Sequence, residues 1–282
     1  MSTTATLTTP AVRLAGNDAI VPLRAFRISK EYLGGSFKAL DDVSFELKEN
    51  QITAFVGPSG CGKTTMLRII AGLEYPTRGS LEVFGKPVVG PGPDRGMIFQ
   101  AYTSFPWLTA QKNVEYGMKL MGVGADERRE RANSFLKLVH LEKFSGSYPR
   151  SMSGGMKQRV ALARTLAQNP QVLLMDEPFG ALDAQVRWEM QELMIELIER
   201  EKKTVVAITH DIEEAIYLAD RIIFFTRQPG RIKADIPVAF KGGQRIQRKE
   251  ELVRMPGYAD LEHQLFAMMR EEIQEKTSTE GN

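Results

Sequence analysis

The segment at 52–71 restricts the possible fold more than any other part of the sequence. It joins the short apolar run ITAFV to the glycine-rich stretch GPSGCGKTT at 57–65, and then to the run MLRIIA, which has no helix breaker. A buried strand that passes through glycines directly into a helix is typical of α/β folds. Glycines let the backbone curl so that amide N–H groups converge beside the positive end of the helix dipole. The stretch at 57–65, called the first glycine loop below, therefore predicts an anion site.

Further apolar runs indicate more strands of the same sheet. They lie at 171–178, where Pro178 stops the run, and at 203–210 and 221–226. Strands that alternate with helices predict an α/β fold with a mostly parallel sheet. One intervening helix is indicated by apolar residues at helical spacing, which we expect to form a single buried face: Val186, Met190, Leu193, Met194 and Leu197.

Residues 101–165 contain no comparable apolar run. Ala132, Phe135, Leu136 and Val139 follow the spacing of an amphipathic helix, and Asp126 precedes them at a plausible N-cap position. We therefore expect a helical subdomain, at about 101–165, inserted into the α/β core.

The two ends of the chain differ from the centre. Residues 1–21 are rich in Ser and Thr near the start, lack an uninterrupted apolar run and predict a flexible tail without an export signal. Residues 229–282 predict a C-terminal extension that ends in a helix at about 258–275. We expect one apolar face of this helix to pack in the core, and that face consists of Leu261, Leu265, Met269 and Ile273.

Composition excludes several classes of protein. The net charge of +2 disfavours a broad nucleic-acid-binding face, so we expect no nucleic-acid partner. No apolar run approaches the roughly 18 residues needed to cross a bilayer. A single cysteine, Cys61, rules out an intrachain disulfide and fits a reducing compartment. We expect a cytoplasmic protein that reaches a membrane only through a partner.

The first glycine loop fits the pattern G-x-x-x-x-G-K-[ST] at every position. In this pattern Lys63 reaches the β- and γ-phosphates of a nucleotide, and the Thr64 hydroxyl binds Mg²⁺. The alternative, a flexible glycine turn, is disfavoured by the strand before and the helix after. Cys61 is interpreted as a small loop residue and not as a nucleophile. The predicted nucleotide-binding residues of the loop are Gly57, Pro58, Ser59, Gly60, Cys61, Gly62, Lys63, Thr64 and Thr65.

Acidic and imidazole side chains follow two of the predicted strands. Asp176 ends the run LLMD and is suited to Mg²⁺, and the adjacent Glu177 is suited to orienting an attacking water. His210 ends the run at 203–210. Taken alone, a histidine at a strand end is more often structural than catalytic.

A second glycine-rich stretch, SMSGGMKQR at 151–159, has no lysine at the phosphate-binding position. Ser153 stands at an N-cap position before a helix-forming run that extends toward Pro170. A hydroxyl, the N–H groups of Gly154 and Gly155, and a helix N-terminus together favour an anion site. Without the other motifs, an ordinary capped helix is the favoured interpretation of this stretch, which is called the second glycine turn below.

Together these motifs resemble the ATP-binding subunits of ABC transporters, whose marker L-S-G-G-Q lies between the Walker A and Walker B motifs. The resemblance covers about residues 22–228. It implies a P-loop NTPase (RecA-like) core with a mostly parallel sheet, a small antiparallel β region and an inserted helical subdomain. It further implies that Tyr32 stacks on adenine, that Gln100 senses Mg²⁺ and that GALD at 180–183 is the D-loop. His210 matches the switch histidine of the family.

The resemblance also implies partners. Ser153 and Gly155 would contact the γ-phosphate of ATP held by the Walker A loop of another subunit, either a second copy or a sister ATPase. Transmembrane permease subunits and, indirectly, a solute-binding protein would complete an importer. The sequences PWLT and PGRI are similar to the nitrate, sulfonate and taurine importer branch. Met152 and Met156 replace the Leu and Gln of the marker, and Gly180 replaces a serine of the D-loop.

Three other functions are compatible with parts of the sequence. A soluble ABC-type ATPase clamp would normally carry long coiled coils or tandem ATPase domains, which this sequence lacks. A P-loop kinase would explain only the first glycine loop. An exporter or lipid-transport ATPase is the alternative that the sequence distinguishes least well from an importer ATPase. The aromatic stretch Phe105, Pro106, Trp107 and Leu108 is compatible either with an exposed docking surface or with subdomain core.

Overall fold

The structure, a computed structural model, describes residues 21–279 except residues 102 and 247. The predicted tail at 1–21 therefore lies, apart from Val21, outside the described residues. A six-stranded sheet at the centre has the order β10-β9-β3-β8-β7-β6. All neighbours are parallel except β9 and β10, which are antiparallel. Its strands are β3 (Ile52–Val56), β6 (Arg95–Ile98), β7 (Val172–Asp176), β8 (Thr204–Ile208), β9 (Arg221–Phe225) and β10 (Ile232–Pro237).

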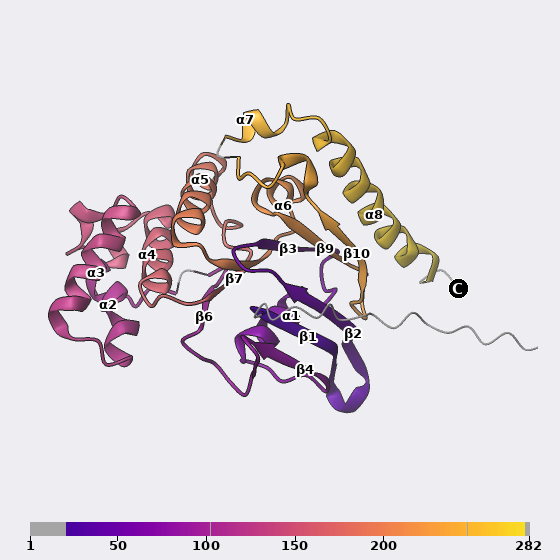
Figure 1. Cartoon of the computed structure of the whole chain (residues 1–282), viewed down its shortest axis with the longest axis horizontal. Helices are drawn as coiled ribbons and strands as arrows, with labels where there is room; N and C mark the ends of the chain where they lie inside the picture. Colours follow the sequence, from indigo (N-terminus) through magenta and orange to yellow (C-terminus); the bar gives the residue numbers. More distant parts are fainter. Residues whose placement is uncertain (1–20, 102, 247, 280–282) are drawn as a thin grey trace, which may run out of the picture.

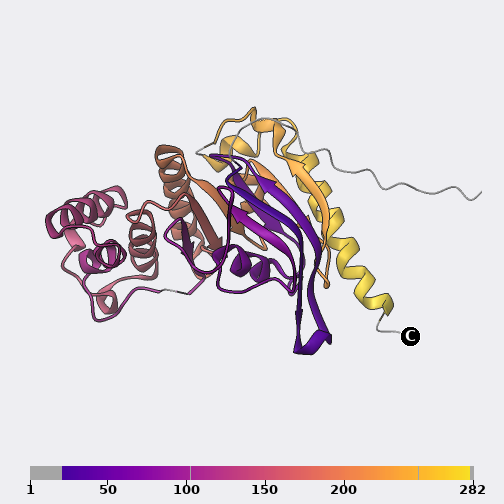
Figure 2. The ribbon, with the colours of Figure 1, turned by 60° about the horizontal axis from the view of Figure 1, so that its bottom comes forward.

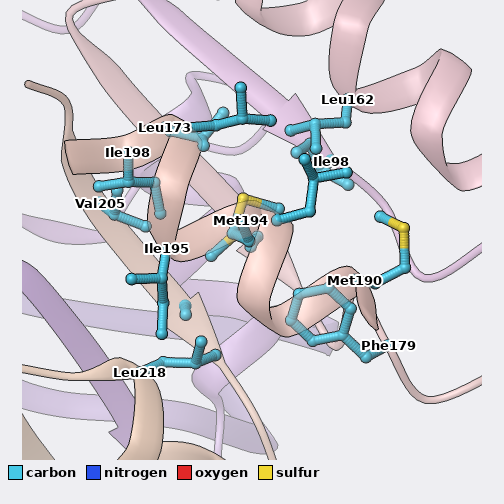
Figure 3. Packing of buried hydrophobic residues seen from close by; sticks show 14 of the residues in the cluster. Ile98, Leu162, Leu173, Phe179, Met190, Met194, Ile195, Ile198, Val205 and Leu218 are labelled. Carbon is cyan, nitrogen blue, oxygen red and sulfur yellow. The ribbon is translucent and has the colours of Figure 1, made fainter. Parts of the chain in front are cut away.

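The apolar runs form the inner strands because helices or a second sheet cover both faces of the central sheet. Every residue of β3 and β8 is buried, as expected for a parallel sheet covered on both sides. Figure 3 shows one side of this core, where Ile198 lies beside Val205, Met194 is central, and Met190 lies near Phe179. The predicted strands are present, with ends that differ by a few residues. The helices around the sheet are α1 (Lys63–Ala71), α4 (Gly154–Leu166), α5 (Ala184–Glu201) and α6 (Ile212–Leu218).

A second sheet is antiparallel and has the order β2-β1-β4-β5. It shares a core with α1 and the central sheet, in which the rings of Phe45 and Phe55 lie 5.3 Å apart. Figures 1 and 2 show this indigo and purple sheet beside α1. The small antiparallel β region is thus confirmed. Its elements are β1 (Leu23–Tyr32), η1 (Leu33–Gly35), β2 (Phe37–Leu47), β4 (Arg78–Val83) and β5 (Lys86–Pro87).

A group of helices projects from the parallel sheet on the side of β6 (Figure 1). Here α2 (Ala110–Leu120), α3 (Ala125–Leu138) and α4 pack against one another, with short turns η2 (Glu142–Phe144) and η3 (Pro149–Ser151) between them. No strand occurs among the described residues of 101–165. The predicted N-cap at Asp126 is wrong: α3 begins at Ala125 after Gly124, and Asp126 lies in its first turn. An acidic residue there still interacts favourably with the helix dipole, which explains the misleading signal.

The C-terminal part continues from β10 through η4 (Ala239–Lys241) and α7 (Lys249–Leu252) to α8 (Tyr258–Thr279). Both views show α8 running beside β10 (Figures 1 and 2). Leu261 and Leu265 are buried, and Met269 packs against the same core. Core packing is wrong for Ile273, whose residue surface is 57% exposed, because residues spaced by four drift around a helix of 3.6 residues per turn, and Glu272 is the residue that faces the body at this turn. Within the described residues, no helix combines the length and apolar character needed to cross a bilayer.

Candidate functional site

The first glycine loop lies at the carboxyl end of β3 and turns into α1. Gly62 precedes α1 with φ +97°, a conformation that glycine adopts without steric cost. A Cβ at this position would also lie 2.7 Å from the Ala39 oxygen. Glycine is therefore required at Gly62 both by conformation and by space, and the loop closes as the sequence pattern predicts.

Lys63 folds back across this loop. Its buried ammonium donates hydrogen bonds to the carbonyl oxygens of Gly57 (2.7 Å) and Pro58 (2.9 Å). Cys61 is also buried, and burial raises the pKa of its thiol, so it is a packed loop residue with little thiolate character. Since alkylating reagents need an accessible thiolate, modification of Cys61 is a poor probe of this site.

Three parallel strands deliver polar side chains next to the loop. The Thr64 hydroxyl donates to Asp176 at the end of β7 (3.2 Å). Burial raises the pKa of Asp176. Hydroxyl and carboxylate oxygens are ligands that Mg²⁺ prefers, so these two residues fit one side of a magnesium ion that also binds phosphate.

Glu177 is held by two side chains from other strand ends. Gln100, after β6, donates from Nε2 to Glu177 Oε2 (3.3 Å), and His210 Nδ1, after β8, lies 3.2 Å from the same oxygen. The backbone of Glu177 has φ +45°, which is unusual for a residue with a side chain, and its N–H donates to the Ile208 oxygen (3.1 Å). Asp176 and Glu177 therefore point to different partners although they are neighbours. The structure brings together Thr64, Gln100, Asp176, Glu177 and His210, as predicted.

Tyr32 ends β1 on the antiparallel sheet. Its hydroxyl donates to Glu74, a residue in the loop after α1, and its ring lies 6.0 Å from that of Phe37. Burial and this hydrogen bond raise the pKa of Tyr32. Glu74 also pairs with Arg68 (3.4 Å). A half-buried, fixed aromatic ring near α1 suits stacking on a flat base.

The second glycine turn forms the N-terminus of α4. Ser153 is the N-cap, and its hydroxyl accepts a hydrogen bond from the Met156 N–H (3.3 Å). Gly154 follows, and Gly155 is buried against Val186, whose Cγ1 would lie 2.5 Å from a Cβ at Gly155. Helix α4 packs on α2, α3, α5 and β6, whereas α1 packs on β2, β6, β7 and β8. Among these neighbours only β6 is common to both helices, so the two glycine-rich segments are supported by largely different elements.

The chain matches the family described as "ABC transporter" over residues 40–180. It is 51% identical over 220 residues to an uncharacterized ABC transporter ATP-binding protein of Methanocaldococcus jannaschii, which covers 77% of this chain and 82% of the relative. The chain belongs to the ABC transporter family.

Two further relatives carry names that specify transport. The nitrate import ATP-binding protein NrtD of Synechocystis sp. is 43% identical over 245 residues, covering 86% of this chain and 92% of the relative. The taurine import ATP-binding protein TauB of Chromobacterium violaceum is 43% identical over 246 residues, covering 87% and 94%. The predicted resemblance to the nitrate and taurine importer branch is confirmed.

A solved structure of an ATP-binding cassette has the same fold. That cassette, a dimer in a post-hydrolysis state bound to ADP and Pi, is 35% identical, with a TM-score of 0.67 and coverage of 77% of this chain and 98% of its own. The P-loop NTPase fold is therefore confirmed. The chain is an ABC ATPase that uses ATP and Mg²⁺.

Two residues with specific contacts in this ABC ATPase were missed at the sequence level. Glu74 binds Tyr32, as described above. Gln158, in α4, donates to the Pro178 oxygen (2.9 Å) and is buried, so it links the second glycine turn to the segment after Glu177. A polar residue within the apolar face of a helix was the available signal for Gln158, because a buried amide needs partners. Glu74 had no such signal, since its partner Tyr32 lies far away in the sequence, on the antiparallel sheet.

The aromatic stretch after Gln100 is divided between the two expected arrangements. Trp107 is 70% exposed, and Pro106 is exposed as well. Phe105 packs on Tyr116, with ring centres 4.6 Å apart, and Arg164 lies 5.3 Å above the Phe105 ring. Within this stretch, Trp107 is therefore the exposed aromatic side chain, and Phe105 is packed beneath it in the helical subdomain.

Proposed function

We propose that the chain is the ATP-hydrolysing subunit of an ABC importer and that it works as a head-to-tail pair. Two ATP–Mg²⁺ lie between the first glycine loop of one subunit and the second glycine turn of the other. One observation carries this proposal: Lys63, Thr64, Asp176 and Glu177 gather around α1, while Ser153 caps α4, whose neighbours other than β6 are different elements. A single subunit thus offers two separate halves of a phosphate site, and rotation of a second copy unites them.

Each residue has a defined role in this proposal. The amides of 57–65 and Lys63 bind phosphate, and Thr64, Asp176 and the Gln100 carbonyl hold Mg²⁺, which neutralises phosphate charge when bound. Glu177 orients the water that attacks the γ-phosphate, and His210 supports the same phosphate. Because Gln100 and His210 both contact Glu177 Oε2, they set the direction of this carboxylate. Tyr32 stacks on adenine.

The second glycine turn contributes Ser153 and the amides of Gly154 and Gly155. Its two departures from the family marker leave these groups intact. Met152 is buried in the core, as an apolar residue of similar size would be, and Met156 packs against the same core. We therefore place phosphate binding in the serine hydroxyl, the backbone and the helix end.

The proposed assembly includes a membrane permease on the ATPase and, beyond it, a solute-binding protein. The chain would be cytoplasmic and peripheral on the inner face of the cell membrane, with the exposed Trp107 at the permease contact. The ABC ATPase domain spans 22–228, with its helical subdomain at about 101–165, and residues 229–282 form a C-terminal extension. The names of two relatives support nitrate or taurine as the cargo, and we extend the candidates to sulfonates and related small solutes. Copurification of the permease and its binding protein, followed by ligand screening with these solutes, tests this part.

The variant Glu177→Gln tests the catalytic part. Loss of the carboxylate should lower kcat by at least about a hundredfold, within the range expected for loss of a general base. ATP binding should persist, so the variant should accumulate as an ATP-bound dimer in sedimentation experiments. Glu46→Gln, which changes a partly exposed glutamate of β2 paired with Arg24, is the control. Undiminished turnover in Glu177→Gln would overturn the catalytic assignment.

A further inference from the structure

The loop that connects β9 to β10, at 226–231, lies directly against the first glycine loop. A Cβ built on Gly57 would lie 2.7 Å from the Phe225 oxygen, and a Cβ on Gly230 would lie 2.0 Å from the Cys61 oxygen. The loop itself therefore touches the first glycine loop at Gly230, whereas the contact of Gly57 is with Phe225, the last residue of β9, directly before the loop. This packing leaves no room for one segment to shift without the other.

Hydrogen bonds fix the same loop to the start of the antiparallel sheet. The Gly230 N–H donates to the Ala39 oxygen (2.9 Å), and the Asp41 N–H donates to the Gly230 oxygen (3.0 Å). Arg231 pairs with Asp41. The loop at 226–231 is thus a wedge between the first glycine loop and β2.

The C-terminal helix reaches this wedge through one carboxylate. Glu272, in α8, has a side chain only 5% exposed, and its Oε2 accepts a hydrogen bond from the Arg227 N–H (2.7 Å). Its Oε1 binds Lys233 Nζ on β10 (2.6 Å). The neighbouring Glu271 binds the same lysine (2.9 Å) with a side chain that is 62% exposed. Two adjacent glutamates therefore share one lysine, and Glu272 additionally holds the wedge.

A buried carboxylate is costly unless charged and hydrogen-bonding partners satisfy it. Both oxygens of Glu272 are satisfied, one by an ammonium and one by a backbone amide, and bonds of this charge-assisted kind are among the stronger ones. The bond to the Arg227 amide links parts of the chain 45 positions apart. Leu261 and Leu265 already anchor the first half of α8. The Glu272 carboxylate therefore fixes the position of Arg227, which apolar packing of α8 does not do.

We propose that Glu272 is a positioning residue for ATP binding: through the Arg227 amide it holds the loop at 226–231 against the first glycine loop. This inference rests on the proposed phosphate-binding role of that loop. The C-terminal helix is then coupled to the nucleotide. Because coupling between two sites is reciprocal, ATP binding must also stabilise the contact between α8 and the wedge.

The test compares Glu272→Gln with Glu271→Gln in the full chain. We expect Glu272→Gln to raise the Kd for ATP by about five- to twentyfold, the lower part of the usual range for coupled sites, while kcat at saturating ATP changes less than about twofold. Glu271→Gln should leave the Kd unchanged because its carboxylate binds only the shared lysine in this account. Equal Kd values for wild type and Glu272→Gln would overturn the inference.

A second variant tests the same inference if Glu272→Gln folds poorly. Glu272→Asp keeps the charge but is one methylene shorter, so it cannot hold both Lys233 and the Arg227 amide, and the same rise in Kd is expected. Hydrogen exchange gives an independent readout: ATP should slow exchange in 226–231 and α8 of the wild type, and this protection should shrink in Glu272→Asp. A purely structural role of Glu272 would lower Tm but would leave ATP affinity and ATP-induced protection unchanged.

The variant Lys63→Ala separates this inference from the proposed function. If Lys63→Ala keeps wild-type ATP affinity, the phosphate-binding role of the first glycine loop is wrong. If Lys63→Ala loses affinity while Glu272→Gln and Glu272→Asp keep it, only the role of Glu272 is wrong.

Discussion

At the scale of single residues, the contact between Tyr32 and Glu74 yields a prediction for ATP affinity. Tyr32→Phe keeps the ring but removes the hydroxyl that binds Glu74, and Glu74→Gln removes the acceptor charge. Each should raise the KM for ATP about two- to tenfold, the usual worth of one hydrogen bond, with kcat unchanged. The double variant should be no worse than either single one.

The control for this prediction is inorganic tripolyphosphate, which has no base to stack. Its inhibition constant against ATP should be equal in wild type, Tyr32→Phe and Glu74→Gln. A parallel loss of tripolyphosphate binding would mean that Glu74 supports the phosphate site and not the base site.

The residues that sequence reasoning found and missed differ in how local their signals are. Lys63, Thr64 and Asp176 stand at fixed positions in or beside an apolar strand, so a short window identifies them. Glu74 lies 42 positions from Tyr32, and Glu272 lies 45 positions from Arg227. Nothing in a local window distinguishes these glutamates from surface residues, because their partners are defined only by the packing of separate elements.

At the scale of elements, the N-terminus of α4 depends on its contact with α5. In Gly155→Ala the new methyl would lie 2.5 Å from Val186 Cγ1, so the two helices must move apart. We expect a loss of about 1–3 kcal/mol in the free energy of unfolding, as for overpacked cores, and reduced hydrolysis because Ser153 moves with the turn. The double variant Gly155→Ala/Val186→Ala should recover both. Urea unfolding and ATPase rates at saturating ATP are the measurements. Failure of Val186→Ala to rescue would show that the clash is not the cause.

Helix α6 contains a buried acid that makes stability depend on pH. Glu214 accepts a hydrogen bond from Gln191, and burial raises its pKa from 4.5 to about 6. Below pH 4.5 the group is protonated in both the folded and the unfolded chain. As pH rises from 4.5 through 6, the unfolded chain releases its proton first, so the free energy of unfolding falls by about 2 kcal/mol. Glu214→Gln should lack this decrease and be the more stable protein above pH 6.

Urea unfolding from pH 4.5 to 7 measures this difference. The control is Glu213→Gln, which changes an exposed glutamate in the same helical turn, paired with Lys249 at 2.7 Å. It should follow the wild-type profile in shape. Parallel profiles for wild type and Glu214→Gln would contradict the prediction.

The elements themselves were predictable where one physical rule dominated. Parallel strands covered on both faces must be apolar throughout, and the runs at 52–57 and 203–210 identified β3 and β8 for that reason. The start of α3 was placed two residues late, with the N-cap at Asp126 and not at Gly124, because Asp126 suits the first turn as well as the cap. The exposure of Ile273 could not be read from the apolar spacing of α8, because the residue that faces the body at this turn is the charged Glu272.

At the scale of the whole molecule, the division of the proposed site between two subunits means that a single subunit holds only part of it. Two surface cavities of about 470 and 340 Å³ lie beside β1 and between α4 and α5, and neither is lined by Lys63, Asp176 or Ser153. Within one subunit the nucleotide site would be an open surface, since enclosure requires the second glycine turn of the partner. A deep pocket is therefore not expected at the first glycine loop of a single chain.

This division predicts complementation between two inactive chains. Lys63→Ala damages the first glycine loop, and Ser153→Arg damages the second glycine turn, so each homodimer has two defective sites. In a mixed dimer the intact first loop of the Ser153→Arg chain meets the intact second turn of the Lys63→Ala chain. Since about half of the dimers in an equal mixture are mixed, up to about a quarter of the wild-type ATPase rate should return if that site works independently.

The matched control mixes Lys63→Ala with Glu177→Gln. Both changes lie in the same half of the site, so every mixed dimer has one site without the lysine and one without the carboxylate, and no activity should return. Recovery in the first mixture but not in the second is the pattern that a head-to-tail pair requires. If Ser153 instead served the phosphate of its own chain, the Ser153→Arg chain would carry a defective site in any dimer, and neither mixture would regain activity.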